Sequence, residues 1–241
     1  MASPKYLTGN QSAINEFIDQ FDVFLFDCDG VLWSGDHLFP GTVETLELLR
    51  SKGKKIVFVT NNSTKSRAEY QKKLTTLGYR TEGVEFIGGT DPAYRRDITP
   101  DDYKGIADGS LLDDNVGVVL AGLDFHINYL KLCHAYHYLR RGAVFLATNT
   151  DSTLPSNHTF FPGAGSISIP LVNMIGKEPT ALGKPNQAMM DSIEGKFQFD
   201  RNKACMVGDR LNTDIKFGIE GKLGGTLAVL TGVSKKKEMA G

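Results

Sequence analysis

The sequence is poor in the features that mark secreted, membrane-bound or disulfide-rich proteins. It has three cysteines in 241 residues, an odd number without a CxxC pair, which argues against a disulfide framework and favours a reducing compartment. No apolar run approaches the ~18 residues of a membrane span, and the opening MASPKYLTGNQ lacks an apolar signal core. We therefore expect a cytoplasmic protein that does not act on a membrane, with the nucleus as the alternative location.

The chain also lacks an excess of charge of either sign. Its formal net charge is -1, so no overall basic field attracts nucleic acid, and a nucleic-acid partner is not expected. An anionic ligand must then be held by a few local groups. With 41% apolar and 23% charged residues, the chain can bury the core of one domain, or of a main domain that carries a smaller one.

Short apolar runs alternate with longer segments of helical periodicity along the chain. The runs are DVFLFD, KIVFVTNN, VGVVLAG, AVFLATN, ACMVGD and TLAVLTG. Strands that are apolar throughout are typical of a parallel sheet covered by helices on both faces. The pattern predicts an α/β fold. Helices are expected to begin at Thr64 and at Lys184-Pro185, because proline at the first helical position loses no needed donor.

Polar side chains follow four of these runs at the point where each predicted strand ends. They are Asp27 and Asp29, Thr60 with Asn61 and Asn62, Asn149 with Asp151, and Asp209. In an open parallel sheet, ligands bind at the carboxyl ends of the strands. Any one cluster taken alone is better explained as a turn or a helix cap, because Asp, Asn and Thr satisfy free backbone amides.

The pair Asp27 and Asp29 is harder to explain as a cap. Residues two apart on an extended chain point to the same side, and two neighbouring carboxylates repel each other unless a cation intervenes. Mg²⁺ suits this position, because it takes oxygen ligands from one or two carboxylates and often bridges to a substrate phosphate. Asp209 could complete the set, and Gly30 would allow a sharp turn that points amides at an anion. We therefore expect metal or phosphate binding here.

Lys184 stands between Gly183 and Pro185 at the predicted start of a helix. A lone lysine is usually a solvated charge. At a helix N-terminus, which already favours anions, an ammonium group would instead neutralise both an aspartate and a phosphate. From the residues alone, both interpretations stay open.

In order along the chain, these residues resemble the four motifs of the haloacid dehalogenase-like superfamily. The DxDGxx motif matches residues 27–32, the strand-ending Thr matches Thr60, the lysine matches Lys184 in GKPNQ, and the acidic motif GDRLNTD contains Asp209 and Asp214. Stretches such as ATNTDSTLP and PGAGS resemble the 4-nitrophenylphosphatase and phosphoglycolate phosphatase branch, over nearly the whole chain. The resemblance implies a Rossmann-like parallel sheet core, an inserted α/β cap domain, and a cytosolic Mg²⁺-dependent enzyme.

The resemblance also implies roles in a two-step phosphoryl transfer. Asp27 would attack phosphorus and form an aspartyl-phosphate, and Asp29 would protonate the leaving oxygen and later deprotonate water. Other residues of the motifs would support them. Phosphoryl oxygens would be bound by Gly30, Thr60, Asn61 and Lys184; Mg²⁺ would be held by Asp27, Asp209 and the backbone carbonyl of Asp29; and Asn62, Arg210 and Asp214 would orient this metal site.

The cap is expected at residues 84–161, which leaves residues 1–83 and 162–241 for the catalytic core. Members of the branch that act on pyridoxal phosphate carry a histidine before the proline of the ATN-type loop, where this chain has Leu154. That difference favours a small acid such as 2-phosphoglycolate. Asn149 and Asp151 either contact the substrate from the cap or only build the loop.

Two neighbours of the acidic pair are assigned to packing. Trp33 is expected to lie under the loop after the nucleophile rather than to touch the substrate. Cys28 is expected to fill space in the core.

The sequence departs from its branch between Glu82 and Val84. Relatives carry a further core strand and helix, and then the first strand and helix of the cap, between segments like LTTLGYRTE and VEFIGGTD. Either a large deletion removed these elements or the sequence as printed omits them. We favour omission, because deletion of a central strand would leave its neighbours unpaired and uncovered. The end after TLAVLTGVSKKKEMAG also looks one strand short.

The leading hypothesis is a Mg²⁺-dependent phosphatase for a small phosphate ester, with 2-phosphoglycolate as the first choice and 4-nitrophenyl phosphate as a second substrate. Alternatives within the class are a phosphatase for pyridoxal phosphate or a sugar-acid phosphate, and a phosphomutase. The alternative from another class is a receiver-like phospho-aspartate signalling module, which would gain nothing from the carboxyl group of Asp29. Whether the chain forms a homodimer is left open by the sequence.

Overall fold

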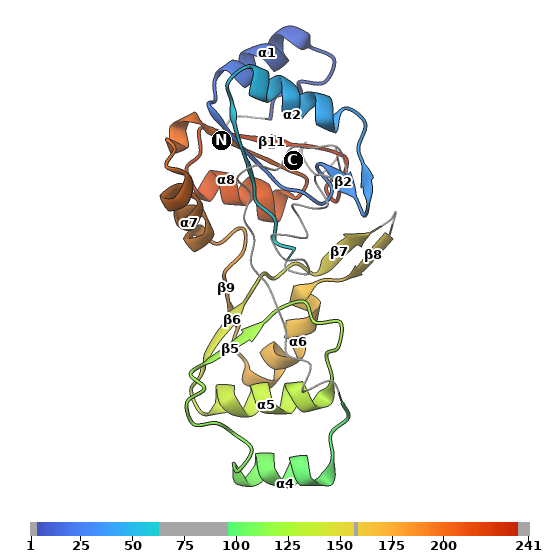
Figure 1. The fold of residues 1–241 in the computed structure, drawn as a ribbon, viewed down its shortest axis with the longest axis vertical. Helices are drawn as coiled ribbons and strands as arrows, with labels where there is room; N and C mark the ends of the chain where they lie inside the picture. Colours follow the sequence, from blue (N-terminus) through green and yellow to red (C-terminus); the bar gives the residue numbers. More distant parts are fainter. Residues whose placement is uncertain (1–3, 63–95, 157–158, 236–241) are drawn as a thin grey trace.

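The computed structural model describes residues 4–62, 96–156 and 159–235. Its larger sheet consists of β1 (Val23–Phe26), β4 (Lys55–Phe58), β10 (Ala204–Gly208) and β11 (Gly225–Ala228). These strands are parallel and lie in the order β11-β10-β1-β4 (Figure 1). Every residue of β1 and β10 is buried. The predicted α/β class with a parallel sheet of apolar strands is confirmed.

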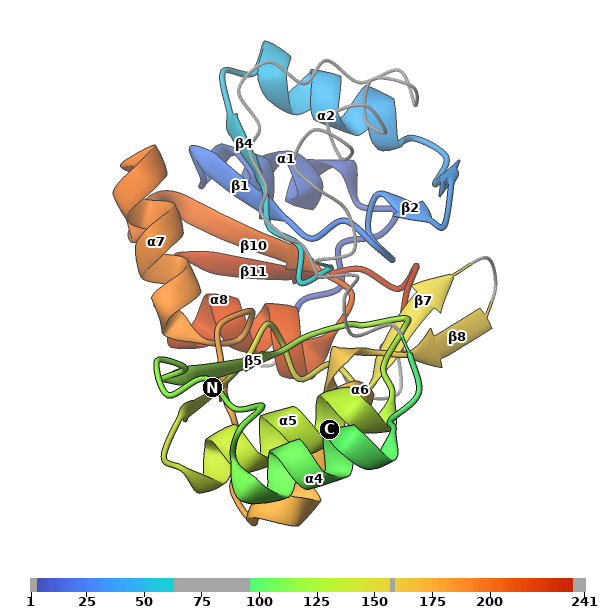
Figure 2. The same cartoon turned by 60° about the horizontal axis from the view of Figure 1, so that its bottom comes forward.

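Helices cover both faces of this sheet (Figure 2). They are α1 (Gln11–Asp19) and α2 (Thr42–Ser51) on one face, and α7 (Gln187–Phe197) and α8 (Lys216–Glu220) on the other. Phe24 and Phe26 of β1 point to the first face, where Cys28 and Trp33 are fully buried as predicted. Leu25 points to the second face. Because both faces are covered, the strands need apolar side chains at successive positions.

A second parallel sheet has three strands in the order β5-β6-β9. They span Val118–Ala121 (β5), Val144–Ala147 (β6) and Thr180–Ala181 (β9), and the neighbouring helices are α4 (Pro100–Asp108), α5 (Tyr129–Arg140) and α6 (Ala164–Ile175). Phe145 of β6 packs with Leu139 of α5 and Leu171 of α6, so these two helices cover one face. Helix α4 lies against α5 on the side away from the larger sheet (Figure 1).

The second sheet extends further along the chain than the cap predicted at residues 84–161. Both α6 and β9 follow residue 161, yet α6 packs on this sheet and Leu146 of β6 pairs with Thr180 of β9. Strand β9 has only two residues, and no apolar run marks it in the sequence. The structure therefore places residues up to Ala181 with the second sheet. The junction at Glu82 to Val84 lies outside the described residues.

Two antiparallel hairpins lie near the carboxyl ends of the larger sheet. Strand β2 (Trp33–Ser34) pairs with β3 (His37–Leu38), which closes the loop that follows Asp29. Strand β7 (Thr153–Ser156) pairs with β8 (Thr159–Pro162) and projects from the junction between the two sheets (Figure 1).

The helix predicted to begin at Lys184-Pro185 begins later, at Gln187. Asn186 caps it by accepting a hydrogen bond from the amide of Ala188. Pro185 precedes this N-cap, so it belongs to the preceding loop rather than to the first helical turn. Lys184 therefore lies in a loop between β9 and α7. The helix start expected at Thr64 lies outside the described residues.

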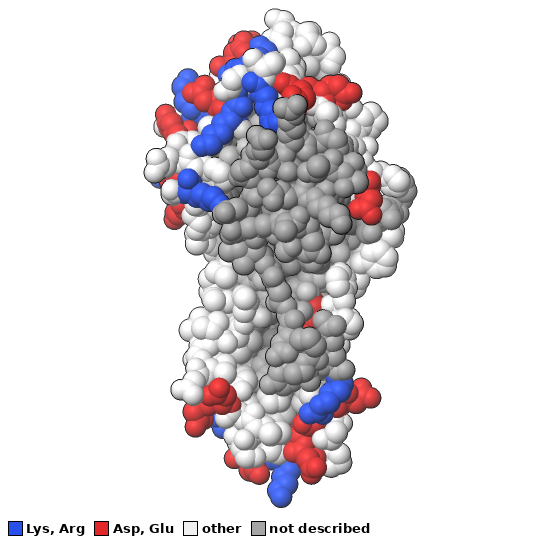
Figure 3. Space-filling view, in the orientation of Figure 1, with Lys and Arg blue, Asp and Glu red and all other residues white. Residues whose placement is uncertain are grey.

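Charge is mixed on the surface. On the face shown in Figure 3, acidic and basic side chains are interspersed at both ends of the molecule, in line with the net charge of -1. None of the helices in the described part of the chain has the length and apolar composition needed to cross a bilayer.

Candidate active site

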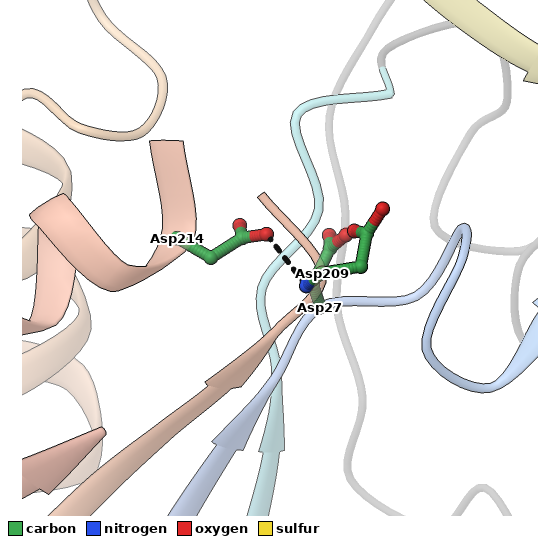
Figure 4. Close-up of side chains that lie close together, drawn as sticks. All are labelled: Asp27, Asp209 and Asp214. Carbon is green, nitrogen blue, oxygen red and sulfur yellow. Dashed lines mark hydrogen bonds between the residues drawn. The ribbon is translucent and has the colours of Figure 1, made fainter. Parts of the chain in front are cut away.

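Three aspartates meet at the carboxyl end of the larger sheet. Asp27 directly follows β1, and Asp209 directly follows β10, the parallel neighbour of β1. Asp214 comes from the short π-helix Leu211–Ile215. One carboxylate oxygen of each residue lies within 4.8 Å of those of the other two (Figure 4). The structure thus brings together the two predicted strand ends, and adds Asp214 to them.

Lys184 compensates part of this negative charge. Its side chain is 1% exposed, and its ammonium group lies 2.7 Å from Asp27 Oδ1 and 2.9 Å from Asp214 Oδ1. It also donates to the carbonyl oxygen of Val59 at 2.6 Å. Burial opposes its charged form, but Asp214 and Asp27 outweigh burial and raise the pKa of Lys184 above its ordinary value. The solvated-charge interpretation is therefore wrong.

Three buried carboxylates around one ammonium group leave an excess of negative charge. Burial raises the pKa of Asp27 well above its ordinary value, Asp214 and Asp209 raise it further, and Lys184 opposes them. Burial also raises the pKa of Asp209. Among the described residues, Asp209 Oδ1 has no hydrogen-bond partner although it is buried. A buried, unpartnered carboxylate oxygen beside two other carboxylates fits a divalent cation.

Asp29 turns its carboxylate to other partners. Asp29 Oδ1 accepts a hydrogen bond from Trp33 Nε1 at 2.8 Å, and Asp29 Oδ2 accepts one from Asn62 Nδ2 at 3.2 Å. Its carboxylate is absent from the acidic cluster found in the described part of the chain. The carboxylates of Asp27 and Asp29 therefore have separate partners in the chain, which are Lys184 for Asp27 and Trp33 and Asn62 for Asp29. A metal contact through the Asp29 carbonyl stays a prediction.

Gly30 turns the chain next to Asp209. Its φ of +87° lies in the left-handed region that favours glycine, and a Cβ at this position would lie 2.7 Å from Asp209 Oδ2. The predicted sharp turn is present. Its amide, however, donates to the carbonyl oxygen of Trp33 at 2.8 Å, so in this structure it serves the turn and is not open to a phosphoryl oxygen.

The loop at residues 231–234, which follows β11, holds Asp209 in place. The amide of Val233 donates to Asp209 Oδ2 at 2.6 Å, and the hydroxyl of Thr231 donates to the carbonyl oxygen of Gly30 at 2.6 Å. This support was not predicted. Its signal in the sequence was the position of the loop, directly after the apolar run TLAVL.

Asn61 joins the second and third motifs. Its Oδ1 accepts from the amide of Lys184 at 2.8 Å, and its Nδ2 donates to the carbonyl oxygen of Lys184 at 3.0 Å. The neighbouring Thr60 Oγ1 accepts from the amide of Asn62 at 3.0 Å. Two loops that are far apart in the sequence are thereby held in one geometry, which fixes Lys184 relative to the end of β4.

Asn149 and Asp151 connect the second sheet to this loop. Asn149 is buried and donates to the carbonyl oxygen of Asn61 at 2.8 Å, while its Oδ1 accepts from the amide of Asp151 at 3.0 Å. Asp151 accepts from Asn61 Nδ2 at 3.1 Å and from Thr213 Oγ1 at 3.3 Å. These bonds give direct support to the loop-building interpretation.

Arg210 links the acidic motif to the β7–β8 hairpin. Its amide donates to Asp214 Oδ2 at 3.0 Å. Its guanidinium group donates to the carbonyl oxygen and the hydroxyl of Thr153, at 2.9 and 3.2 Å. The side chain thus contacts the hairpin, and only its backbone contacts the acidic cluster.

A pocket opens between the ends of the two sheets. Most of the residues that line it were predicted: Asp27, Asp29, Thr60, Asn61, Asn62, Asn149, Asp151, Leu154, Lys184, Arg210 and Asp214. The lining residues that were missed are Leu123, Thr153, Gly163, Ala164 and Thr213. Leu123 follows β5 closely, so the rule of strand ends could have found it. Gly30 and Asp209 are not among the described residues that line this pocket.

Comparisons with known proteins agree with this site. Two family models match, one described as haloacid dehalogenase-like hydrolase over residues 24–95 and one described as HAD-hydrolase-like over residues 181–241. The 4-nitrophenylphosphatase of Schizosaccharomyces pombe is 46% identical over 267 aligned positions, which cover 93% of this chain and 88% of that protein. Phosphoglycolate phosphatase 1A of Arabidopsis thaliana, a chloroplastic protein, is 39% identical over 259 aligned positions, which cover 91% of this chain and 71% of that protein.

Solved structures show the same likeness. The 4-nitrophenylphosphatase of Thermotoga maritima superposes with a TM-score of 0.76 at 32% identity, over 92% of this chain and 90% of that one. A glycerol phosphate phosphatase of Mycobacterium tuberculosis, solved in complex with magnesium, has a TM-score of 0.71 at 27% identity, over 90% of this chain and 70% of that one.

The parallel sheet with four motifs at its strand ends defines a haloacid dehalogenase-like hydrolase, and the chain belongs to that family. Within the family it belongs to the branch that contains 4-nitrophenylphosphatases and phosphoglycolate phosphatases, and the predicted assignment to the phosphatases is confirmed.

The alignment with the fission-yeast relative is longer than this chain. It has 267 positions against 241 residues, so the relative carries residues that have no counterpart here. This agrees with the additional segment that we expect in relatives between Glu82 and Val84.

Proposed function

We propose that the protein is a Mg²⁺-dependent phosphatase that hydrolyses small phosphate monoesters through a covalent intermediate on Asp27. One observation carries the proposal. Asp27 lines the pocket, pairs with the buried ammonium group of Lys184 at 2.7 Å, and belongs to a cluster of three carboxylates. A carboxylate held in this way can act as a nucleophile toward phosphorus.

In the first half of the proposed reaction, a carboxylate oxygen of Asp27 attacks phosphorus. The bond between phosphorus and the leaving oxygen breaks, and Asp29 gives its proton to that oxygen, so that a neutral alcohol departs. Lys184 balances the negative charge of the phosphoryl group, and Thr60 offers its hydroxyl to a phosphoryl oxygen. Asn61 holds the loop of Lys184 in place for this step.

In the second half, water attacks the same phosphorus atom. Asp29 takes a proton from the water, and the bond between phosphorus and Asp27 breaks. Inorganic phosphate leaves, Asp27 returns to its carboxylate form, and Asp29 is protonated again for the next substrate. Asp29 lines the pocket, and hydrogen bonds from Trp33 and Asn62 hold its carboxyl group. The group can therefore transfer protons in both halves of the reaction without moving.

The carboxylates of Asp27, Asp209 and Asp214, together with the carbonyl group of Asp29, would hold Mg²⁺. When bound, the ion supplies positive charge that offsets the charge of the phosphoryl group. Support comes from the buried oxygen of Asp209 without a described partner and from the excess negative charge of the cluster. The related M. tuberculosis enzyme was solved with magnesium.

Among possible substrates, 2-phosphoglycolate is favoured. Lys184 and Arg210 are the cationic side chains among the described residues that line the pocket. Lys184 would balance the charge of the phosphate group, and Arg210 would attract the carboxylate of the glycolate. The described lining has no aromatic side chain and no histidine to hold a pyridine ring, and Leu154 stands in that region. Both facts disfavour pyridoxal phosphate.

The test is a panel of phosphate esters assayed with MgCl₂ or with EDTA. The panel contains 2-phosphoglycolate, glycerol 3-phosphate, erythronate 4-phosphate, pyridoxal phosphate and 4-nitrophenyl phosphate. We expect turnover only with Mg²⁺ and the highest kcat/KM for 2-phosphoglycolate. Comparable kcat/KM values for all esters would instead indicate a generalist.

The matched variant is Asp27→Asn, which keeps the volume of the side chain and removes the nucleophile. We expect it to lose turnover on every ester. Full turnover by this variant on 4-nitrophenyl phosphate would sink the proposed mechanism. Wild-type protein that is phosphorylated once and slowly on Asp27, and that releases no phosphate, would favour the receiver-like alternative.

A further inference from the structure

Trp33 is the chain's only tryptophan, and its indole ring is fixed beside Asp29. The side chain is fully buried in the core between the larger sheet, α1 and α2. Its backbone is also held in place, because its carbonyl oxygen accepts from the amide of Gly30 at 2.8 Å and the residue pairs with Leu38 of β3. A ring anchored in this way has little freedom to rotate.

The indole N–H reaches from this core to the proposed proton-transfer group. Trp33 Nε1 donates to Asp29 Oδ1 at 2.8 Å. An indole nitrogen is a donor only, so it presents its hydrogen to Asp29 at every stage of a reaction. Asn62 Nδ2 donates to the other oxygen at 3.2 Å. Together the two donors fix the plane of the Asp29 carboxyl group, which lines the pocket while Trp33 does not.

We propose that Trp33 is a positioning residue, which holds the carboxyl group of Asp29 in the orientation that proton transfer requires. The inference rests on the proposed function of Asp29. It assigns no substrate contact to Trp33, because the side chain is buried. Packing alone would explain why a large aromatic residue stands here, but not why its polar edge faces Asp29.

Two substitutions separate the donor from the packing. Trp33→Phe keeps an aromatic ring and removes the N–H. Global replacement of tryptophan by β-(3-benzothienyl)alanine puts sulfur in place of the N–H at nearly the same volume, and it changes Trp33 alone because the chain has 1 tryptophan. Agreement between the two variants would show that the effect comes from the lost donor.

The readout is the dependence of kcat/KM on the leaving group. An alkoxide is strongly basic and needs a proton from Asp29, whereas 4-nitrophenolate is stable near neutral pH and leaves without one. We expect both variants to lose about 10-fold in kcat/KM on the alkyl ester that the panel shows to be turned over, 2-phosphoglycolate or glycerol 3-phosphate. The loss on 4-nitrophenyl phosphate should be much smaller, and the Mg²⁺ concentration for half-maximal activity should not change.

The control is Leu46→Val, which trims a buried side chain of the same core that has no bond to Asp29. It should lower the thermal midpoint and leave kcat/KM on both esters unchanged. Equal losses on both esters in the two Trp33 variants, or no loss on either, would overturn the inference and leave the proposed function standing. Wild-type protein that hydrolyses no ester would overturn both.

Discussion

The ammonium nitrogen of Lys184 lies 2.7 Å from Oδ1 of Asp27, although 157 positions separate the two residues in the sequence. Both side chains are almost entirely buried, and Asp214 approaches the same ammonium group at 2.9 Å. The carboxylates of Asp27 and Asp214 therefore share one ammonium group, that of Lys184. This relationship leads to the first prediction.

Replacement of Lys184 by methionine should destabilise the protein and abolish turnover. Methionine keeps an unbranched side chain but removes the ammonium group that the carboxylates of Asp27 and Asp214 both contact. We expect the free energy of unfolding in EDTA to fall by about 3–5 kcal/mol, the usual cost of breaking a buried pair. Urea unfolding measures it. The control is Lys52→Met, because the exposed pair of Lys52 with Asp19 at 3.2 Å should contribute less than about 1 kcal/mol. Equal effects of the two substitutions would contradict the prediction.

Asp209→Asn should stabilise the protein in EDTA at neutral pH. Burial raises the pKa of Asp209 above its ordinary value of 3.8, so the folded state binds more protons than the unfolded state over the range between the two pKa values. The free energy of unfolding then falls as pH rises through the folded-state pKa. Asparagine removes this titration while it can still accept from Val233. Urea unfolding between about pH 4 and about pH 7 should show a gain for the variant that vanishes toward pH 4. A gain in the free energy of unfolding that grows toward low pH would contradict this prediction.

Removal of Mg²⁺ should lower the thermal midpoint of the wild-type protein. An ion that binds only the folded state adds about 2.7 kcal/mol at a concentration 100 times its Kd. The measurement is thermal unfolding in MgCl₂ and in EDTA at matched ionic strength. Asp209→Asn lacks one of the three clustered carboxylates, so its midpoint should respond little to Mg²⁺. A similar response in both proteins would place the ion elsewhere.

Gly232→Ala should weaken metal binding. A Cβ at Gly232 would lie 1.9 Å from Asp209 Oδ2, so the carboxylate must move. We expect the Mg²⁺ concentration for half-maximal activity to rise about 10–100-fold, as for other groups that support a metal ligand. Gly195→Ala is the matched control, because nothing lies within 4 Å of its added Cβ in helix α7; it should stabilise the protein by about 0.4–1 kcal/mol without a change in Mg²⁺ dependence. Unchanged Mg²⁺ dependence in Gly232→Ala would argue against a metal at Asp209.

Asn149→Ala should decide between the two interpretations of the loop after β6. It leaves the carbonyl oxygen of Asn61 and the amide of Asp151 without their present partner, which should cost about 1–3 kcal/mol of the free energy of unfolding. If Asn149 builds the loop, kcat should fall with little change in KM. A raised KM with unchanged stability would instead indicate direct contact with the substrate. Asn202→Ala removes an exposed bond to Asp200 and should change stability by less than about 0.5 kcal/mol.

Much of the site could be predicted because parallel strands deliver their carboxyl ends to one edge. The runs before Asp27 and Asp209 are apolar throughout, and the two strands are neighbours in the sheet. Side-chain direction could not be predicted in the same way. Asp29 stands two residues after Asp27 yet bonds to Trp33 and Asn62, whereas Asp214 joins Asp27 and Asp209. These directions depend on which partners packing brings close.

The sequence by itself determined the α/β class, the order of the four motifs and the family, because hydrophobic periodicity and the residues that end each strand are local properties of the chain. Only the tertiary structure decided that Lys184 is buried, that Asn62 donates to Asp29, and that the second sheet extends to Ala181. Each of these depends on contacts between segments distant in the sequence or on a strand too short to leave a pattern. Burial and hydrogen-bond partners become defined only when such segments pack together.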